Sequence, residues 1–96
     1  MPNLISIIVP VYNEAGTIAE VIDRLLTIDL PADREVIVVD DGSKDETRNV
    51  LRRLDGASPA LMVVHADRNR GKGAAVRLGL SKSCGSVTAP LSGSIA

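Results

Sequence analysis

The stretch REVIVVDDGSKDETRNVL, residues 34–51, decides the fold. Its apolar, mostly β-branched run is typical of a strand covered on both faces, and we place this strand at residues 35–39. Asp40 and Asp41 follow directly, and Gly42-Ser43 then turns the chain. Because apolar residues recur at helical spacing over residues 47–54, the stretch predicts a strand followed by a helix.

The same order of strand and helix is found before and after this stretch. The predicted strands are residues 4–9, 35–39 and 61–65, and the predicted helices are residues 18–26, 47–54 and 74–80. Thr17 and Glu20 before the first helix have capping-box spacing, as do Ser43 and Glu46 before the second. Three such units in succession predict an α/β fold with parallel strands and right-handed crossovers.

Length and composition limit the possible functions. A chain of 96 residues is one small domain, and its single aromatic residue, Tyr12, implies an aliphatic core. The net charge of −1, with basic residues scattered along the sequence, argues against binding to nucleic acid or anionic lipid. Since Cys84 is a lone cysteine and no secretory signal or membrane-spanning stretch is evident, we expect a cytoplasmic protein.

The pattern changes after residue 80. The segment SKSCGSVTAPLSGSIA, residues 81–96, is rich in Ser, Gly and Ala and shows neither a helical face nor a complete strand. We therefore interpret residues 1–85 as the folded part and residues 86–96 as an irregular or non-native tail.

Asp40 and Asp41 lie where a ligand would be expected. In open parallel sheets, ligands bind beyond the carboxyl ends of the strands, and carboxylates there can accept hydrogen bonds from ribose hydroxyls or nucleobase N–H groups. The alternative is ordinary turn chemistry, since Asp-Gly-Ser is a common way to leave a strand.

Two further loops should reach the same edge of the sheet. Tyr12 and Glu14 follow the first strand, where the ring could stack on a planar base or fold back onto its own helix. The alternative for Glu14 is a common structural role, in which its negative charge stabilises the N-terminus of the following helix. Lys72 lies between Gly71 and Gly73 after the third strand, a combination that suits a phosphate, although Gly and Lys are also common loop residues.

Other nucleotide-binding classes fit less well. A dinucleotide-binding dehydrogenase needs a glycine-rich turn after the first strand, and residues 10–14, PVYNE, provide none. A response-regulator-like receiver would carry its acidic pair after the first strand, not the second. A P-loop needs Ser or Thr after its lysine, and Lys72 is followed by glycine. His65 is interpreted as a residue at a strand boundary, and Cys84 as a cysteine without a catalytic partner.

Three motifs in matching order give the chain a specific resemblance. SIIVPVYNE, VIVVDDGSKDET and NRGKGAAVRLGL resemble the N-terminal half of the family-2 glycosyltransferases over residues 4–85. The resemblance is closest to the branch of dolichyl-phosphate or polyprenyl-phosphate mannose and glucose synthases. It implies a Rossmann-like, GT-A-type sheet with strand order 3-2-1, which binds a nucleotide-diphosphate sugar at its carboxyl edge. The nucleotide-binding residues that it implies are Pro10, Tyr12 and Glu14 beside the nucleoside, Asp41 on the base, Asp40 shaping the pocket and Lys72 near the base or phosphates.

The sequence departs from the family after the third helix. Members continue into a fourth strand ending in Asp-x-Asp, which holds Mg²⁺ or Mn²⁺, whereas no acidic residue follows Asp67 here. We therefore expect a truncated fragment that binds a GDP- or UDP-hexose but has no catalytic or metal-binding residue and is inactive alone. The full-length reaction implied is transfer of mannose or glucose to a polyprenyl phosphate. The alternative is a binding-only remnant or an oligomerising fragment with no activity.

The expected truncation has a consequence for association. Family members have strand order 3-2-1-4, so a chain without the fourth strand would leave the apolar first strand, residues 4–9, at the edge of the sheet. The backbone groups of an unpaired strand edge can pair with another chain, and we expect the isolated fragment to self-associate there.

Overall fold

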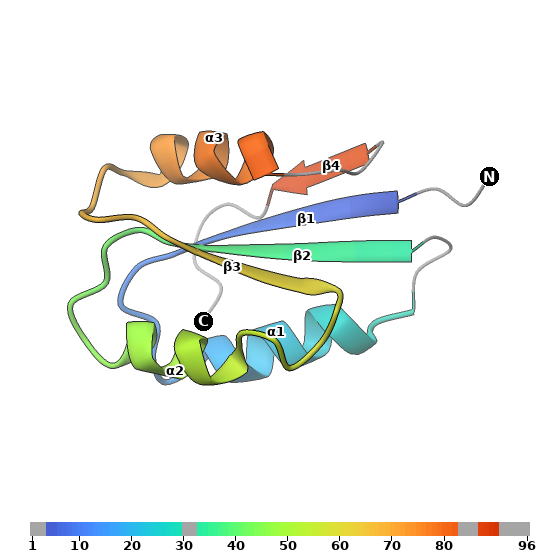
Figure 1. Cartoon of the computed structure of the whole chain (residues 1–96), viewed down its shortest axis with the longest axis horizontal. Coiled ribbons are helices and arrows are strands. Elements are labelled where there is room, and N and C mark those ends of the chain that lie inside the picture. Colours follow the sequence, from blue (N-terminus) through green and yellow to red (C-terminus); the bar gives the residue numbers. More distant parts are fainter. Residues whose placement is uncertain (1–3, 30–32, 83–86, 91–96) are drawn as a thin grey trace.

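The computed structural model describes residues 4–29, 33–82 and 87–90 as a parallel sheet with helices on both faces (Figure 1). The strands form one sheet in the order β3-β2-β1-β4, and every pairing is parallel. The fold class expected from the sequence is therefore correct. The elements are β1 (Leu4–Val11), α1 (Ile18–Thr27), β2 (Asp33–Asp40), α2 (Thr47–Leu54), β3 (Leu61–His65), α3 (Lys72–Lys82) and β4 (Val87–Pro90).

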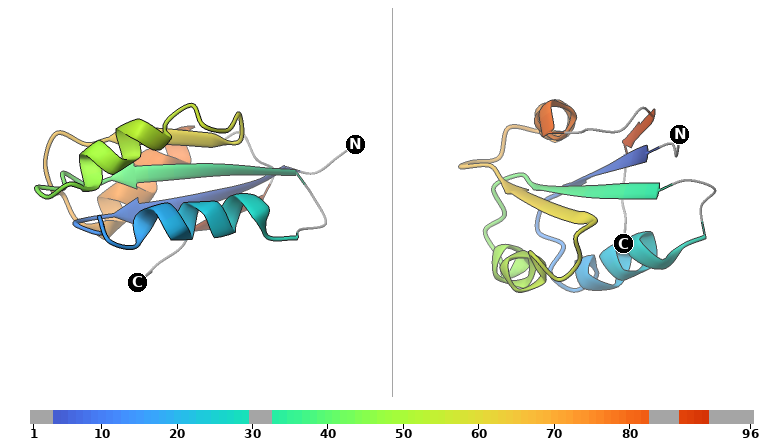
Figure 2. Two further views of the ribbon diagram at one scale, coloured as in Figure 1. Left: turned by 90° about the horizontal axis from the view of Figure 1, so that it is seen from below. Right: turned by 45° about the vertical axis from the view of Figure 1, so that its right-hand side comes forward.

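The sheet separates two layers of apolar packing. Figures 1 and 2 show α1 and α2 on one face and α3 on the other. Ile7, Val9 and Val11 of β1 point towards α1 and α2, where Leu51 packs against them, while Ile8 belongs to the layer under α3. This alternation explains the continuous apolar runs of β1 and β2, because both faces of these strands are covered. None of the helices in the described part of the chain has the length and apolar character needed to cross a membrane.

The contact between α3 and the sheet depends on a glycine. Gly79 faces the sheet, and a Cβ added at this position would overlap the side chain of Ile8 and press against Val39. Helix α3 therefore lies closer to the sheet than a larger residue would permit, which fixes the position of the loop before it.

The prediction of an irregular tail is wrong for residues 87–90. These residues form β4, which pairs with β1 from Ile5 opposite Val87 to Ile8 opposite Pro90. The local composition favoured a coil, but the edge of β1 offers a row of backbone partners, and this tertiary pairing outweighs the local preference. The predicted strand order 3-2-1 is therefore incomplete. Because β1 lies between β2 and β4, it has no free edge at this segment, and the reason given for self-association through β1 does not hold. Residues 86 and 91–96 lie outside the described residues.

Neither predicted capping box is formed. The Thr17 hydroxyl makes no cap hydrogen bond and instead donates to Oε2 of Glu14 at 3.3 Å. Helix α2 begins after Glu46, not after Ser43, and the amide of Thr47 donates to Oδ1 of Asp45. The hydroxyl of Ser43 is used in a contact with another loop, described below.

Candidate functional site

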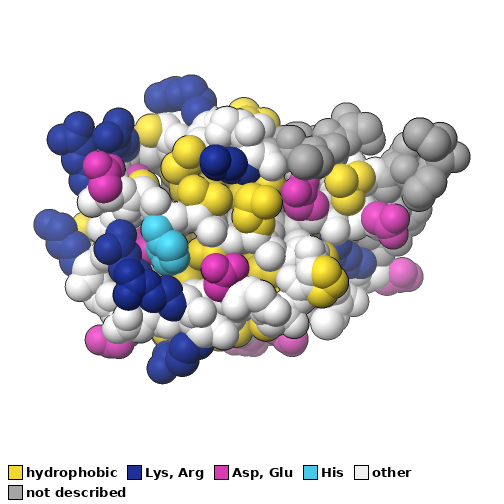
Figure 3. Space-filling model, in the orientation of Figure 1, with side chains coloured by type: hydrophobic (Ala, Val, Ile, Leu, Met, Phe, Trp, Pro, Cys, Tyr) yellow, Lys and Arg dark blue, Asp and Glu magenta, His cyan; other side chains and the backbone are white. Residues whose placement is uncertain are grey.

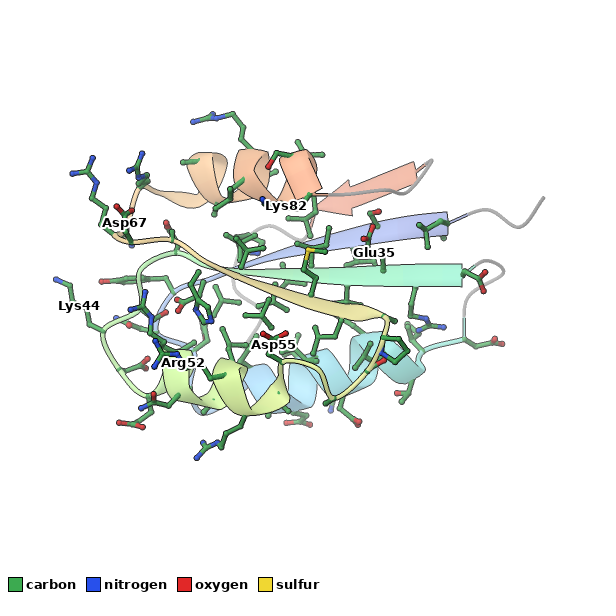
Figure 4. All side chains as sticks on the ribbon, in the orientation of Figure 1. Glu35, Lys44, Arg52, Asp55, Asp67 and Lys82 are labelled. Carbon is green, nitrogen blue, oxygen red and sulfur yellow. The ribbon has the colours of Figure 1, made fainter. Side chains whose placement is uncertain are left out.

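Three loops meet at the carboxyl edge of the sheet. They are residues 12–17 after β1, 41–46 after β2 and 66–71 after β3, and Figure 1 shows them at the same end of the molecule. Lys44 of the second loop and Asp67 of the third are labelled at this end in Figure 4. Because parallel strands share their direction, side chains distant in sequence are brought together here.

Asp41 ties the second loop to the third. Its side chain is 5% exposed, its Oδ1 accepts the amide of Arg70 at 3.0 Å, and its Oδ2 accepts the amide of Gly71 at 3.1 Å. The amide of Asp41 itself donates to the carbonyl of Val11 at 2.8 Å, which connects the end of β1. The carboxylate is thus held at a fixed place between the loops.

Gly42 allows the third loop to pass directly over the second. Its φ of +73° is in the left-handed region, and a Cβ here would overlap the backbone of Arg68 and Asn69. Glycine is required by both the conformation and the close approach.

Asp40 lies beneath the surface and organises its neighbours. Its side chain has no exposure, Oδ1 accepts the amide of Ser43 at 2.9 Å, and Oδ2 lies 3.2 Å from Nδ1 of His65. Nε of Arg48 is 3.6 Å from the same Oδ2. Burial acts to raise the pKa of Asp40, but hydrogen bonds from Ser43 and His65 outweigh it and hold the pKa below the ordinary value of 3.8.

Hydrogen bonds join the first loop to the second loop and to the start of α2. The amide of Asn13 donates to Oγ of Ser43 at 3.0 Å, and Oδ1 of Asn13 accepts the amide of Lys44 at 2.9 Å. The amide of Glu14 donates to Oγ1 of Thr47 at 2.8 Å. Asn13 takes a left-handed φ of +53°, which asparagine tolerates better than most residues.

Glu14 has the role of a residue at a helix start. Its carbonyl accepts the amides of Thr17 and Ile18 at the beginning of α1, and its carboxylate accepts the hydroxyl of Thr17. The ordinary alternative stated for this residue from the sequence is therefore the one that its contacts support.

A small cavity of about 160 Å³ opens between the first and third loops. It brings together three of the six residues expected from the sequence, since its lining is Pro10, Val11, Tyr12, Asp41, Asn69 and Gly71. Tyr12 is 39% exposed and is therefore accessible to a ligand in solution. Glu14 and Asp40 do not line this cavity. Lys72 is the first residue of α3, next to Gly71, and its side chain lies outside what the structure describes.

Asn69 and Gly71 line the cavity but were not among the expected site residues. Their signal in the sequence was the glycine-containing loop after the third strand. Asn69 and Gly71 reach the cavity because the third loop passes over Gly42, and the spacing of residues in the sequence does not show this path.

A larger cavity of about 540 Å³ also borders Asp41 and lies beside α3. Its lining comes from the end of β3, the third loop and one face of α3, and consists of Asp41, His65, Ala66, Asp67, Arg70, Ala74, Ala75, Arg77 and Leu78. Figure 3 shows the histidine at the end of the molecule where Lys and Arg side chains gather.

The described residues do not form a metal site. Within residues 4–29, 33–82 and 87–90, no three His, Cys, Asp or Glu side chains are grouped so that they could hold a metal ion. The carboxylates of Asp40 and Asp41 are each occupied by backbone N–H groups, and Asp67 is paired with Arg70. We therefore derive no chemical step through a metal for this part of the chain.

Comparison with known proteins gives a consistent picture. The family model described as Glycosyl transferase family 2 matches residues 6–91. Dolichyl-phosphate beta-glucosyltransferase from Mus musculus is 39% identical over 90 residues, which cover 84% of this chain and 28% of that protein. This chain therefore spans little more than a quarter of the length of that relative.

Two solved structures share the fold. The mannosyltransferase PcManGT from Pyrobaculum calidifontis, in complex with GDP-Man and Mn²⁺, has a TM-score of 0.80 and 35% identity, covering 92% of this chain and 26% of that one. S. aureus TarS 1-349, in complex with UDP-GlcNAc, has a TM-score of 0.77 and 30% identity, covering 91% of this chain and 25% of that one.

Proposed function

Because the chain belongs to glycosyl transferase family 2, we propose that the small cavity binds the nucleoside part of a nucleotide-diphosphate sugar. The observation that supports this best is the meeting of Pro10, Tyr12 and Asp41 at one cavity, although they come from the end of β1 and from two separate loops.

The chemistry of the lining suits a planar base. The ring of Tyr12 can stack on a base, because Tyr12 is exposed and lines the cavity. Each oxygen of Asp41 already accepts one backbone N–H, and a carboxylate oxygen has a second lone pair for an N–H of the base. Guanine and uracil both carry such an N–H next to a carbonyl, so we propose a GDP- or UDP-hexose as the ligand.

We place the diphosphate near the start of α3. Gly71 and Gly73 flank Lys72, and backbone N–H groups at a helix start attract phosphate. PcManGT holds Mn²⁺ together with GDP-Man, and we propose that a Mg²⁺ or Mn²⁺ ion at the corresponding place would need ligands other than the described residues.

We propose that residues 1–85 bind the sugar donor in a glycosyl transfer reaction. In that reaction a hexose, mannose or glucose, is transferred to a polyprenyl phosphate or a similar acceptor at the cytoplasmic face of the membrane. The chain as given would bind the donor without transferring the sugar. The second candidate, favoured by the lack of a metal-binding group among the described residues, is a binding-only module with no enzymatic activity.

Calorimetric titration tests the proposal. We expect the chain to bind GDP or UDP, and we expect the Tyr12→Ala variant to bind about 5-fold to 150-fold more weakly, because stacking on a base contributes about 1–3 kcal/mol. Asp55→Asn, an exposed change after α2, is the control and should bind as the parent chain does. A folded parent chain that binds neither GDP nor UDP, with or without Mn²⁺, would contradict the proposal.

A further inference from the structure

The larger cavity beside α3 does not hold the nucleoside in the proposed function. Asp41 lines both cavities, but their linings share no other residue, since Arg70 belongs to the larger cavity and Gly71 to the small one. At about 540 Å³ the larger cavity is large enough for an organic ligand of moderate size. Its lining therefore needs an explanation of its own.

Two guanidinium groups belong to this lining. Arg77 reaches back along α3, since its Nη1 lies 3.8 Å from a Cβ placed on Gly73 in the first turn. Arg70 comes from the third loop and pairs with Asp67 at 3.5 Å. Because the side chains of Arg70 and Asp67 are 53% and 78% exposed, this ion pair is weak and screened by solvent, so Arg70 can turn towards an anion at little cost.

His65 adds a third polar group, and its orientation is fixed. Its Nδ1 lies 3.2 Å from Oδ2 of the buried Asp40, which has no exposure and accepts the proton of that nitrogen. The ring is held in one orientation while its other nitrogen, Nε2, remains for a ligand. A histidine supported in this way by a buried carboxylate is a prepared polar group, unlike a loose surface side chain.

The remaining lining is small and apolar. Ala66, Ala74, Ala75 and Leu78 form it, and Figure 3 shows hydrophobic side chains between the histidine and α3. The two carboxylates in the lining add little repulsion of an anion, because Asp41 is 5% exposed with both oxygens on backbone N–H groups, and the charge of Asp67, which is 78% exposed, is screened by solvent.

We propose that this cavity binds a phosphate group, as inorganic phosphate or as a phosphomonoester with an apolar substituent, through Arg70, Arg77 and His65. Phosphate fits better than a carboxylate because the two guanidinium groups donate to its oxygens, while Nε2 of His65 accepts the hydrogen of a protonated phosphate oxygen, which an ionised carboxylate lacks. The apolar residues of α3 are suited to the first carbons of the substituent. The site is separate from the nucleotide-sugar pocket and does not depend on it.

NMR titration of the 96-residue chain with inorganic phosphate tests this. The ring signals of His65 are unambiguous because the chain has a single histidine. We expect phosphate to shift these signals and the amides of residues 70–77, and to do so equally in the presence of saturating GDP. Arg77→Gln should weaken phosphate binding at least about tenfold, as expected for loss of a charge-assisted hydrogen bond, and leave GDP affinity unchanged. Arg77→Lys should restore part of the binding.

The matched control is Arg53→Gln, because Arg53 is exposed on α2, the helix on the opposite face of the sheet. If Arg53→Gln weakens phosphate binding as much as Arg77→Gln does, the attraction is general surface charge and the proposal is overturned. If GDP displaces the phosphate, the two ligands share one site and the proposal is likewise overturned. Butyl phosphate distinguishes the sources: tighter binding than inorganic phosphate identifies an ester ligand, and equal binding identifies free phosphate.

Discussion

Asp40 and Asp41 are neighbours in sequence but have different roles. Successive side chains in a strand point to opposite faces, so Asp40 meets Arg48 of α2 on one side, while Asp41 meets the loop before α3 on the other. The buried Asp40 joins the ends of β2 and β3 to each other, and Asp41 borders both cavities. The two adjacent carboxylates therefore have separate tasks: Asp40 holds the end of β2 to β3 and α2, and Asp41 holds the loop before α3.

The contribution of Asp40 to stability should depend on pH. Its pKa in the folded protein is below the ordinary value of 3.8, so its stabilising effect is complete above that value and is lost as the pH falls through the lower, folded pKa. We expect the free energy of unfolding to fall more steeply below pH 3.8 in the parent chain than in Asp40→Asn. At neutral pH, Asp40→Asn should be less stable by about 1–3 kcal/mol, because Arg48 and His65 lose a charged partner.

Urea unfolding at a series of pH values measures this difference. Asp55→Asn changes an exposed carboxylate and should keep the acid dependence of the parent chain. Parallel curves for the parent chain and Asp40→Asn throughout the acid range would show that Asp40 is not the group responsible.

At the scale of elements, the sequence predicted what depends on local patterns. The three longer strands and the helices α1 and α2 follow from apolar patterns. Tyr12 and Asp41 were expected at a site because they lie where strands end, and Pro10 because of the family resemblance. The second capping box is not formed because the hydroxyl of Ser43 accepts a hydrogen bond from Asn13, 30 residues away in sequence, and the first because the hydroxyl of Thr17 donates to Glu14. Strand β4 was missed because its four residues become a strand only through pairing with β1, and a partner strand cannot be read from local composition.

Two glycines in α3 should respond to the same substitution in opposite directions. Gly79→Ala places a methyl group against Ile8 in a packed layer, and we expect a loss of about 1–3 kcal/mol in the free energy of unfolding. At Gly73 a Cβ meets only Nη1 of Arg77, at 3.8 Å, so Gly73→Ala should stabilise the helix by about 0.5–1 kcal/mol. Thermal unfolding of both variants measures this, and a destabilised Gly73→Ala beside a neutral Gly79→Ala would contradict the packing described for α3.

At the scale of the whole molecule, β4 determines which strand edges are exposed. With β4 in place, the edges of the sheet are β3 and β4, and the apolar β1 is covered on both sides from Ile5 to Ile8. Removal of β4 would leave the backbone groups of this segment without partners and would expose a template for another chain.

Self-association should therefore depend on β4. We expect a chain that ends at residue 86 to form dimers or larger species, because the freed edge of β1 pairs with a second molecule. A chain that ends at residue 90 retains β4 and serves as the matched control, which should sediment with a smaller mass at the same micromolar concentration. The comparison separates the effect of the strand from that of residues 91–96, because both variants lack them. If both chains sediment as monomers, pairing with β4 is not what protects β1, and the packing of α3 over Ile8 would have to protect that strand instead.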